Sequence, residues 1–508
     1  MARVVSTADG WLDDVLDPGS FCSWDIAIGV PADADYRDVL ARAATRTGAD
    51  EAVRTGSGSV RGRAVAVIVS EFGFLGGSIG VATAERIVAL FDRARRERIP
   101  VLAGLASGGT RMQEGAAAFL TMRTITTAVG AYRAAGLPYL AHLRHPTTGG
   151  VYASWASLAH DVSAEPGALV GLLGPRVVAA LAEHGGAPPI SEGVQTAENL
   201  RAHERLDAVV DAARFRDRAA RLLAVFETAD GAVAPDPVGD AVSPAAATRT
   251  GVPSGADWAA VQNAARPGRP ALGEFIAACD EFVGRRGGPG ELITGWARSG
   301  KAAFLLIGQD RTRRTATTVA DVVAARRAMA LAAALGVPVV AVADTSGAEV
   351  STSAEEEGIA QEVALTLAAS ASLPVPSVTL LLGEGTGAAA IALCGTDALV
   401  AVEDSWLAPL PLTGAAALLA GDRAGGEEAV RAQLAGQQRI GAASLFADGL
   451  IQGIAGRDGV TMSALLDGCR ARPLAARVLA IAAGLVSSEP QATPRGAPIS
   501  PALIGGRG

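Results

Sequence analysis

Continuous apolar runs and amphipathic segments alternate along the first half of the chain. Residues 60–70 begin with polar and apolar residues in alternation and then become continuously apolar, which predicts a buried strand. Residues 84–97 carry apolar side chains at helical spacing and predict a helix with one buried face. Residues 101–105 predict a second strand. A third should run from Pro138 until Pro146 breaks it. The first half therefore predicts an α/β domain.

The same pattern returns in the second half. Strands are predicted over 302–308, 337–343 and 378–382, with helices over 319–335 and 355–369. Pro138 and Gly149 have counterparts in Pro376 and Gly387, each 238 positions further along the chain. This spacing indicates an internal duplication with a period near half the chain.

A stretch without periodicity separates the two halves. Residues 230–257 are rich in Pro, Ala, Gly and Ser, as a linker would be. The sequence therefore predicts a first domain over 1–229, a linker over 230–257 and a second domain over 258–508.

Composition narrows the possible classes of function. The net charge is −8 without a basic block, so nucleic acid is not an expected partner. The four cysteines lie far apart and have neither zinc-ribbon spacing nor a disulfide pattern. The N-terminus lacks the apolar core of a signal peptide, and no uncharged apolar run reaches about 18 residues. We expect a cytoplasmic protein without a metal site or a membrane partner.

Glycine-rich turns after the strands are the candidate functional elements. A strand that ends in a Gly-Gly turn before a helix directs free N–H groups into one small volume, where an oxyanion can bind. Glycine also lets a substrate approach the backbone. One such pair could be an ordinary turn, but the pattern recurs. The predicted turn residues are Gly108, Gly109, Thr148, Gly149, Gly150, Gly387, Ala388 and Ala389, and a small-residue helix over 151–158, which contains Tyr152, should follow Gly150.

These turns favour one type of chemistry over others. No serine lies on a nucleophile elbow, and Ser107 has no evident histidine partner, so a hydrolase triad is not expected. His142 and His145 lie on an extended run without nearby cysteine or carboxylate ligands. Backbone N–H groups stabilise developing oxyanions, and an enolate next to a thioester carbonyl needs such groups.

The motifs of the two halves resemble those of one enzyme family. The first half, over about 60–210, resembles the β subunit of the bacterial acetyl-CoA carboxylase carboxyltransferase, and the second, over about 290–455, looks like the α subunit. The matching motifs lie at 74–80, 106–115, 146–150 and 164–168, and at 344–347, 354–358 and 383–387. The resemblance implies an α/β protein of two tandem crotonase-like (ClpP/crotonase) ββα-superhelix domains.

The resemblance also implies an activity and roles for the turn residues. A carboxyl group would pass from carboxybiotin to the α-carbon of an acyl-CoA such as acetyl-CoA, through an enolate held by oxyanion holes, as in fatty acid biosynthesis. Gly149 and Gly150 would form one oxyanion hole, Ala388 and Ala389 the other. Further roles would be a floor formed by Gly108 and Gly109, a CoA contact along Gly76 and Gly77, and other substrate contacts at Thr148, Tyr152 and Gly387. Arg111 either faces a phosphate or pairs with Glu114.

The resemblance implies outside partners as well. The single lysine, Lys301, lies outside any Ala-Met-Lys-Met motif, and no ATP-grasp-like segment is present. Carboxybiotin would therefore be supplied in trans by a biotin carboxyl carrier protein and a biotin carboxylase. The resembled enzyme pairs its subunits, so a homodimer is expected.

The chain departs from the family pattern at several points, which leaves other functions open. A zinc ribbon is absent, Tyr152 replaces a small residue, Ala388–Ala389 replaces Gly-Gly, and Leu410–Pro411 replaces a Pro-Glu-Gly turn. A biotin-independent malonyl-thioester decarboxylase of the same fold would need only one oxyanion hole. The glycines of 383–387 also partly match a dinucleotide fingerprint. A third alternative is a scaffold subunit that does not bind acyl-CoA.

Overall fold

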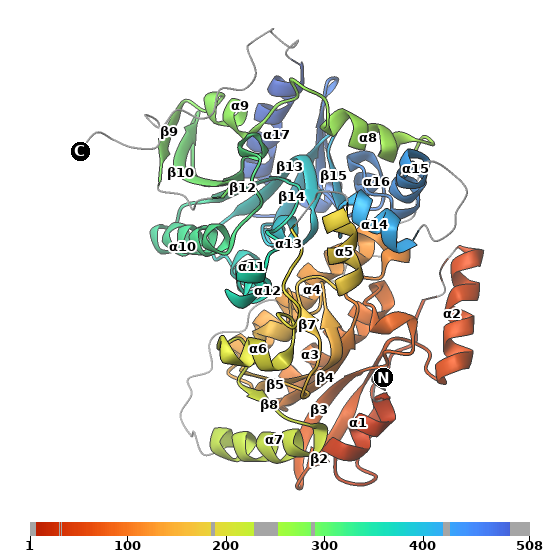
Figure 1. Cartoon of the computed structure of the whole chain (residues 1–508). Helices are drawn as coiled ribbons and strands as arrows, with labels where there is room; N and C mark the ends of the chain where they lie inside the picture. The colour runs from red at the N-terminus through yellow and green to blue at the C-terminus, as the bar shows by residue number, and fades with distance from the viewer. Residues whose placement is uncertain are drawn as a thin grey trace. The chain divides into compact units, whose positions relative to one another are not determined.

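The structure is a computed structural model that describes residues 7–29, 31, 33–183, 188–227, 252–285, 290–419 and 427–487 (Figure 1). The chain divides into two compact units. The N-terminal unit comprises Met1–Pro175, Ile190–Ser243 and Glu355–Ala364, and the C-terminal unit comprises Arg176–Pro189, Pro244–Ala354 and Leu365–Gly508. The segment Arg176–Pro189 thus belongs to the C-terminal unit although it lies in the first half of the sequence, and Glu355–Ala364 belongs to the N-terminal unit although it lies in the second half. Most of the linker predicted over 230–257 lies outside the described residues.

The N-terminal unit is built on a sheet in the order β1-β2-β3-β4-β5-β6-β8, with β7 paired to β5. The strands from β3 onward run parallel, and β1 and β2 add an antiparallel edge. The strands are β1 (Cys22–Ser23), β2 (Val53–Val60), β3 (Arg63–Ser70), β4 (Val101–Ser107), β5 (Tyr139–Thr148), β6 (Asp161–Ala164), β7 (Val170–Gly171) and β8 (Ala208–Val209).

Helices cover both faces of this sheet, which explains why β3 reads as a continuous apolar run. Val65, Val67 and Val69 face one side, where α1 and α7 pack, while Phe91 of α3 contacts the rings of Tyr132 and Tyr139 on the other. The helices of this unit are α1 (Ala8–Val15), α2 (Ala34–Thr47), α3 (Val81–Glu97), α4 (Gly115–Ala134), α6 (Ala197–Ala202) and α7 (Ala212–Glu227), with short 3-10 turns η1 (Leu75–Gly77), η2 (Met112–Glu114) and η3 (Ala156–Leu158).

The C-terminal unit repeats this plan in the order β17-β16-β14-β13-β12-β11-β10-β9, with β15 paired to β13. Helices α9 and α17 pack on one face, and α10 on the other. The strands are β9 (Glu281–Gly284), β10 (Leu292–Ser299), β11 (Ala302–Gln309), β12 (Val339–Thr345), β13 (Ser377–Thr386), β14 (Ala398–Val402), β15 (Trp406–Ala408), β16 (Gly453–Gly456) and β17 (Gly459–Met462).

The remaining helices are α5 (Pro175–Glu183), α8 (Ala256–Ala264), α9 (Leu272–Ala277), α10 (Val319–Leu335), α11 (Thr352–Glu356), α12 (Ile359–Ala371), α13 (Gly387–Ile391), α14 (Leu412–Leu419), α15 (Glu427–Gln438), α16 (Ala442–Ala447) and α17 (Arg472–Ser487), with 3-10 turns η4 (Arg311–Arg313) and η5 (Ala464–Leu466). None of the helices in the described part has the length and apolar character needed to cross a bilayer.

The internal duplication predicted from the sequence is confirmed by the strand register. Ser107 pairs with Thr147 across β4 and β5, and Thr345 pairs with Gly385 across β12 and β13, both after a register shift. Partners in the two pairs are 238 positions apart, the spacing found in the sequence. Helices α3 and α10 begin and end at the same spacing. The two units therefore present matching strand ends.

Three local predictions were wrong. Strand β5 does not break at Pro146 but continues to Thr148, because the proline lies beside the register shift, where a ladder bond is not required. The segment 151–158 contains only turns and η3. The hydroxyls of Ser154 and Ser157 there donate to backbone carbonyls, which competes with helix formation. The helix predicted over 355–369 is interrupted at Gly358, whose φ is +79°.

Candidate active site

Three glycine pairs predicted to be functional meet at the carboxyl ends of β3, β4 and β5. The first turn contains Gly76–Gly77, the second Gly108–Gly109 and the third Gly149–Gly150. The Gly108 N–H donates to the Gly76 carbonyl at 2.9 Å, which joins the first and second turns. A Cβ atom on Gly109 would lie 3.0 Å from the Gly150 nitrogen and 3.2 Å from the Gly149 Cα, so the second and third turns are in direct contact. The carboxyl ends of parallel strands are the usual place for a ligand in an α/β sheet.

Close packing requires glycine at several of these positions. A Cβ on Gly77 would lie 2.1 Å from the Ala106 carbonyl oxygen. Gly109 and Gly149 have φ values of +101° and +67°, a region that side chains disfavour. The turns thus lie against one another without side chains between them, and the backbone itself forms the surface.

The N–H groups of these turns are not equally available. The Gly109 N–H donates to the Ser107 hydroxyl at 3.0 Å, and the Gly149 N–H makes a long bond of 3.3 Å to the Gly171 carbonyl. Among the described residues, the Gly150 N–H has no acceptor. Gly150 is therefore the open donor of the predicted pair, while Gly108 and Gly109 contribute shape and not free N–H groups.

In the C-terminal unit, the structural register moves the predicted pair by one residue. Gly387 begins α13 with φ +61° and stands 238 positions after Gly149, so the counterpart of Gly149–Gly150 is Gly387–Ala388. Ala389 is fully buried, and its carbonyl accepts a bond of 3.1 Å from Gln309 Nε2. The first N–H groups of a helix lack partners within the helix. Gly387, Ala388 and Ala389 are the first three residues of α13 and occupy such positions, and a Cβ on Gly387 would meet only the Pro409 oxygen at 3.5 Å.

A buried carboxyl group, Glu291, is connected through hydrogen bonds to the turn at Gly387 and Ala388. Glu291 precedes β10 and accepts bonds from the hydroxyls of Thr317 and Thr345, and its Oε2 atom has no partner within the described residues. Burial raises the pKa of the Glu291 carboxyl to about 8. The Thr317 hydroxyl also accepts from Gln309 Nε2, the group that holds Ala389. Sequence reasoning missed this network, and its only signal was a glutamate directly before an apolar strand.

Arg111 takes the second of its two predicted roles. The side chain is 1% exposed and forms a buried ion pair with Glu51 and a contact of 3.4 Å with Glu114. Its remaining donors bind the Ser78 carbonyl and the Thr83 hydroxyl. The guanidinium therefore joins the loop before β2 to the start of α3, and it is not directed toward a ligand phosphate.

Tyr152 and Thr148 are both buried beside the third turn. Thr148 pairs with Gly171 in the β5–β7 ladder. The Tyr152 hydroxyl has no hydrogen-bond partner in the described part of the chain, and burial raises its pKa. The carboxylate of Glu355 lies close enough to Tyr152 to raise that pKa further.

The two histidines predicted not to bind metal have other roles. His142 is buried between Trp11 and Phe215, accepts a bond of 3.0 Å from the Trp11 indole N–H and contacts the Val210 carbonyl. Burial lowers its pKa to about 4, so the ring is neutral. His145 Nδ1 accepts from the Leu169 N–H. Within the described ranges, no group of three or more His, Cys, Asp or Glu residues has the arrangement of a metal site.

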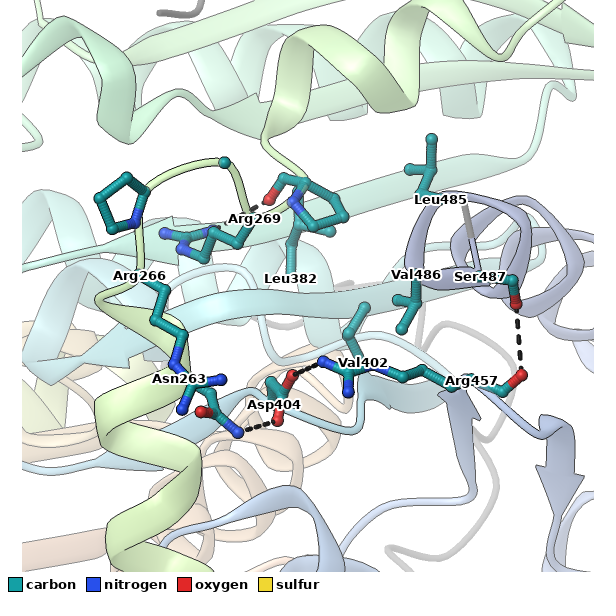
Figure 2. Close-up of a pocket in the computed structure, with 13 residues that line it drawn as sticks. Asn263, Arg266, Arg269, Leu382, Val402, Asp404, Arg457, Leu485, Val486 and Ser487 are labelled. Carbon is teal, nitrogen blue, oxygen red and sulfur yellow. Dashed lines mark hydrogen bonds and ion pairs between the residues drawn. The ribbon is translucent and has the colours of Figure 1, made fainter. Parts of the chain in front are cut away.

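A cavity of about 510 Å³ in the C-terminal unit lies apart from the predicted residues. Figure 2 shows its polar wall, where Asp404 accepts from Asn263 at 2.7 Å and contacts Arg457 at 3.7 Å. Arg269, on the opposite loop, is paired with Asp344. Three polar side chains of this wall, Asn263, Asp404 and Arg457, are thus paired with one another, and none of the predicted turn residues lines the cavity.

Comparison with known proteins gives a consistent family. The carboxyl transferase domain matches residues 13–448. A probable biotin-dependent acyl-coenzyme A carboxylase beta3 subunit of Mycobacterium tuberculosis (strain ATCC 25618 / H37Rv) is 44% identical over 463 residues, which cover 89% of each chain. The acetyl-coenzyme A carboxylase carboxyl transferase subunits beta/alpha of Salinispora arenicola are 34% identical, over 84% of this chain and 78% of that protein. A carboxyl transferase subunit beta of Synechococcus is 42% identical but covers 43% of this chain and 71% of its own.

Proposed function

Because the chain belongs to the carboxyl transferase domain family, we propose that it is the carboxyltransferase of a biotin-dependent acyl-CoA carboxylase. The observation that carries this proposal is the pair of equivalent turns, Gly149–Gly150 and Gly387–Ala388, at matching strand ends of a duplicated α/β plan. The tandem crotonase-like architecture is part of the same proposal, supported by the duplication. The substrate would be an acyl-CoA such as acetyl-CoA.

The open N–H of Gly150 would hold the thioester oxygen of the acyl-CoA. An enolate at the α-carbon carries negative charge on that oxygen, and a donor already in position would stabilise the charge without reorganisation. Gly149, Gly108 and Gly109 would keep side chains away from the thioester. Gly76 and Gly77 would lie along the CoA, as the resemblance implies.

The turn at Gly387 and Ala388 would bind the biotin urea oxygen. This turn fits such a group because its N–H groups stand at a helix start and Gly387 brings no side chain of its own. When bound, carboxybiotin supplies the carboxyl group. The chain's own contribution is to orient the urea carbonyl and to favour charge on its oxygen. A separate biotin carboxyl carrier protein and a biotin carboxylase would be the partners.

Titration calorimetry with acetyl-, propionyl- and malonyl-CoA tests the substrate class. We expect heat of binding with at least one of the three acyl-CoA compounds, and loss of that heat when Gly150→Pro distorts the turn. A complete lack of heat, together with an unchanged thermal midpoint in the presence of all three, would contradict the proposal and favour a scaffold subunit.

A further inference from the structure

The peptide group between Gly171 and Leu172 is bound on both sides. Its carbonyl, on Gly171, accepts the N–H of Gly149 at 3.3 Å. Its N–H, on Leu172, donates to both carboxylate oxygens of Glu355 at 3.0 and 3.2 Å. A single peptide plane therefore connects the Glu355 carboxylate to the turn that carries the open donor of Gly150.

Gln195 completes a clamp on the same segment. Its Nε2 atom donates to Glu355 Oε1 at 2.6 Å and to the Leu173 carbonyl at 2.8 Å. A Cβ on Gly171 would lie 2.4 Å from Gln195 Nε2, so the Gln195 amide packs directly against this glycine. Both Glu355 and Gln195 are buried. Residues 171–173 are thus held from the side opposite to β5.

Burying an ionised carboxylate at this position costs free energy. Burial raises the pKa of the Glu355 carboxyl to about 7, and the two hydrogen bonds that lower it do not offset that cost. The groups around it are the Tyr152 phenol, the Gln195 amide and the Leu172 N–H, with Arg205 acting on Tyr152. The next residue, Glu356, lies 3.8 Å from His203 instead. Glu51 is paired with Arg111, whereas no cation is paired with Glu355 among the described residues, so its burial is not offset by an ion pair.

We propose that Glu355 is a positioning residue for carboxyl transfer: with Gln195 it fixes the Gly171–Leu172 peptide and so aims the Gly149–Gly150 turn. The proposal rests on the function proposed above. The carboxylate accepts from both donors at once, Leu172 N–H and Gln195 Nε2. When Glu355 is protonated, one oxygen becomes a donor and the clamp loses an acceptor. The turn should then be held less firmly, and kcat should fall as the pH decreases through about 7.

The test compares Glu355→Gln with the matched control Glu356→Gln, on the same short helix. The first readout is backbone amide exchange, which does not depend on activity. We expect faster exchange in peptides covering 147–151 and 170–173 for Glu355→Gln, and wild-type exchange for Glu356→Gln. Unchanged exchange in both peptides would overturn the clamp, whatever the enzyme assay shows.

The second readout is carboxyl transfer. We expect kcat of Glu355→Gln to fall about tenfold, with the KM for acyl-CoA within about twofold of wild type, and the acidic decline near pH 7 to disappear. Faster exchange with wild-type kcat and an unaltered pH profile would overturn the positioning role. A wild-type protein inactive with every acyl-CoA would defeat the proposed function, while the exchange result would still decide whether Glu355 holds the turn.

Discussion

Replacing Gly109 with alanine is the sharpest perturbation of the candidate site. The new Cβ would lie 3.0 Å from the Gly150 nitrogen, 3.2 Å from the Gly149 Cα and 3.3 Å from the Thr148 oxygen. All three atoms belong to the backbone, so no flexible side chain can move away. The third turn must shift by a few tenths of an ångström, and the shift acts directly on the open donor of Gly150.

The magnitude follows from two contributions. Gly109 has φ +101°, and a side chain in the left-handed half of the backbone map costs about 1–2 kcal/mol of stability. Loss of one oxyanion-hole donor costs about 2.7–4 kcal/mol of activation free energy. Because Gly109→Ala displaces the donor without removing it, we expect the lower end, a fall in kcat of about a hundredfold.

The assay measures kcat for carboxyl transfer and the thermal midpoint on the same preparations. Gly130→Ala in α4 is the matched control, since a Cβ there meets nothing within 4 Å. That control should keep wild-type kcat and gain about 0.5–1 kcal/mol of stability. If Gly109→Ala retained wild-type kcat, the contact between the second and third turns would not shape the reacting site, and the reasoning would be refuted.

Four further predictions concern other parts of the molecule. Gly150→Pro removes the open N–H and should abolish transfer, whereas Gly150→Ala keeps the N–H and should retain measurable kcat, since its Cβ would meet only side chains, Thr110 Oγ1 at 2.9 Å and Met122 at 3.2 Å; equal rates for the two variants would contradict the role of that donor. Arg111→Met leaves Glu51 buried without its cation and should destabilise the protein by about 3–5 kcal/mol in denaturant titration, with little change in KM for any surviving enzyme. Burial raises the pKa of Glu355 from the usual 4.5 to about 7, so folding favours the protonated carboxyl. The wild type should therefore lose up to about 3 kcal/mol of stability relative to Glu355→Gln as the pH rises from 4.5 to above 7. A constant difference between the thermal midpoints of the two proteins over this pH range would contradict the prediction. Light scattering at micromolar concentration should give a homodimer, and a fully active monomer would exclude it.

The local pattern of the sequence predicted much of the fold. The apolar periodicity of 319–335 matches α10 (Val319–Leu335), and the predicted helix over 84–97 falls within α3 (Val81–Glu97). The duplication was evident because Pro138 and Pro376 open equivalent strands. These features depend on neighbouring residues and on a repeated spacing, both of which can be read directly from the sequence.

The details of the candidate site depend on contacts that the sequence does not contain. Glu355 and Leu172 are 183 residues apart, and no local pattern links them. The spacing of 238 residues already matched Gly387 to Gly149 in the sequence, and the strand register makes Gly387–Ala388 the counterpart of Gly149–Gly150, one residue before the predicted pair Ala388–Ala389. Arg111 offered two partners in sequence, and only the tertiary structure brings Glu51 to its guanidinium.

Biotin dependence of carboxyl removal from malonyl-CoA distinguishes a carboxyltransferase from a decarboxylase. Purified protein is incubated with malonyl-CoA, with and without free biotin, and acetyl-CoA is measured over time. A biotin-dependent carboxyltransferase running in reverse should form acetyl-CoA only when biotin is present to accept the carboxyl group, and Gly150→Pro should abolish that reaction. Acetyl-CoA formed at the same rate without biotin would contradict the account and identify a decarboxylase.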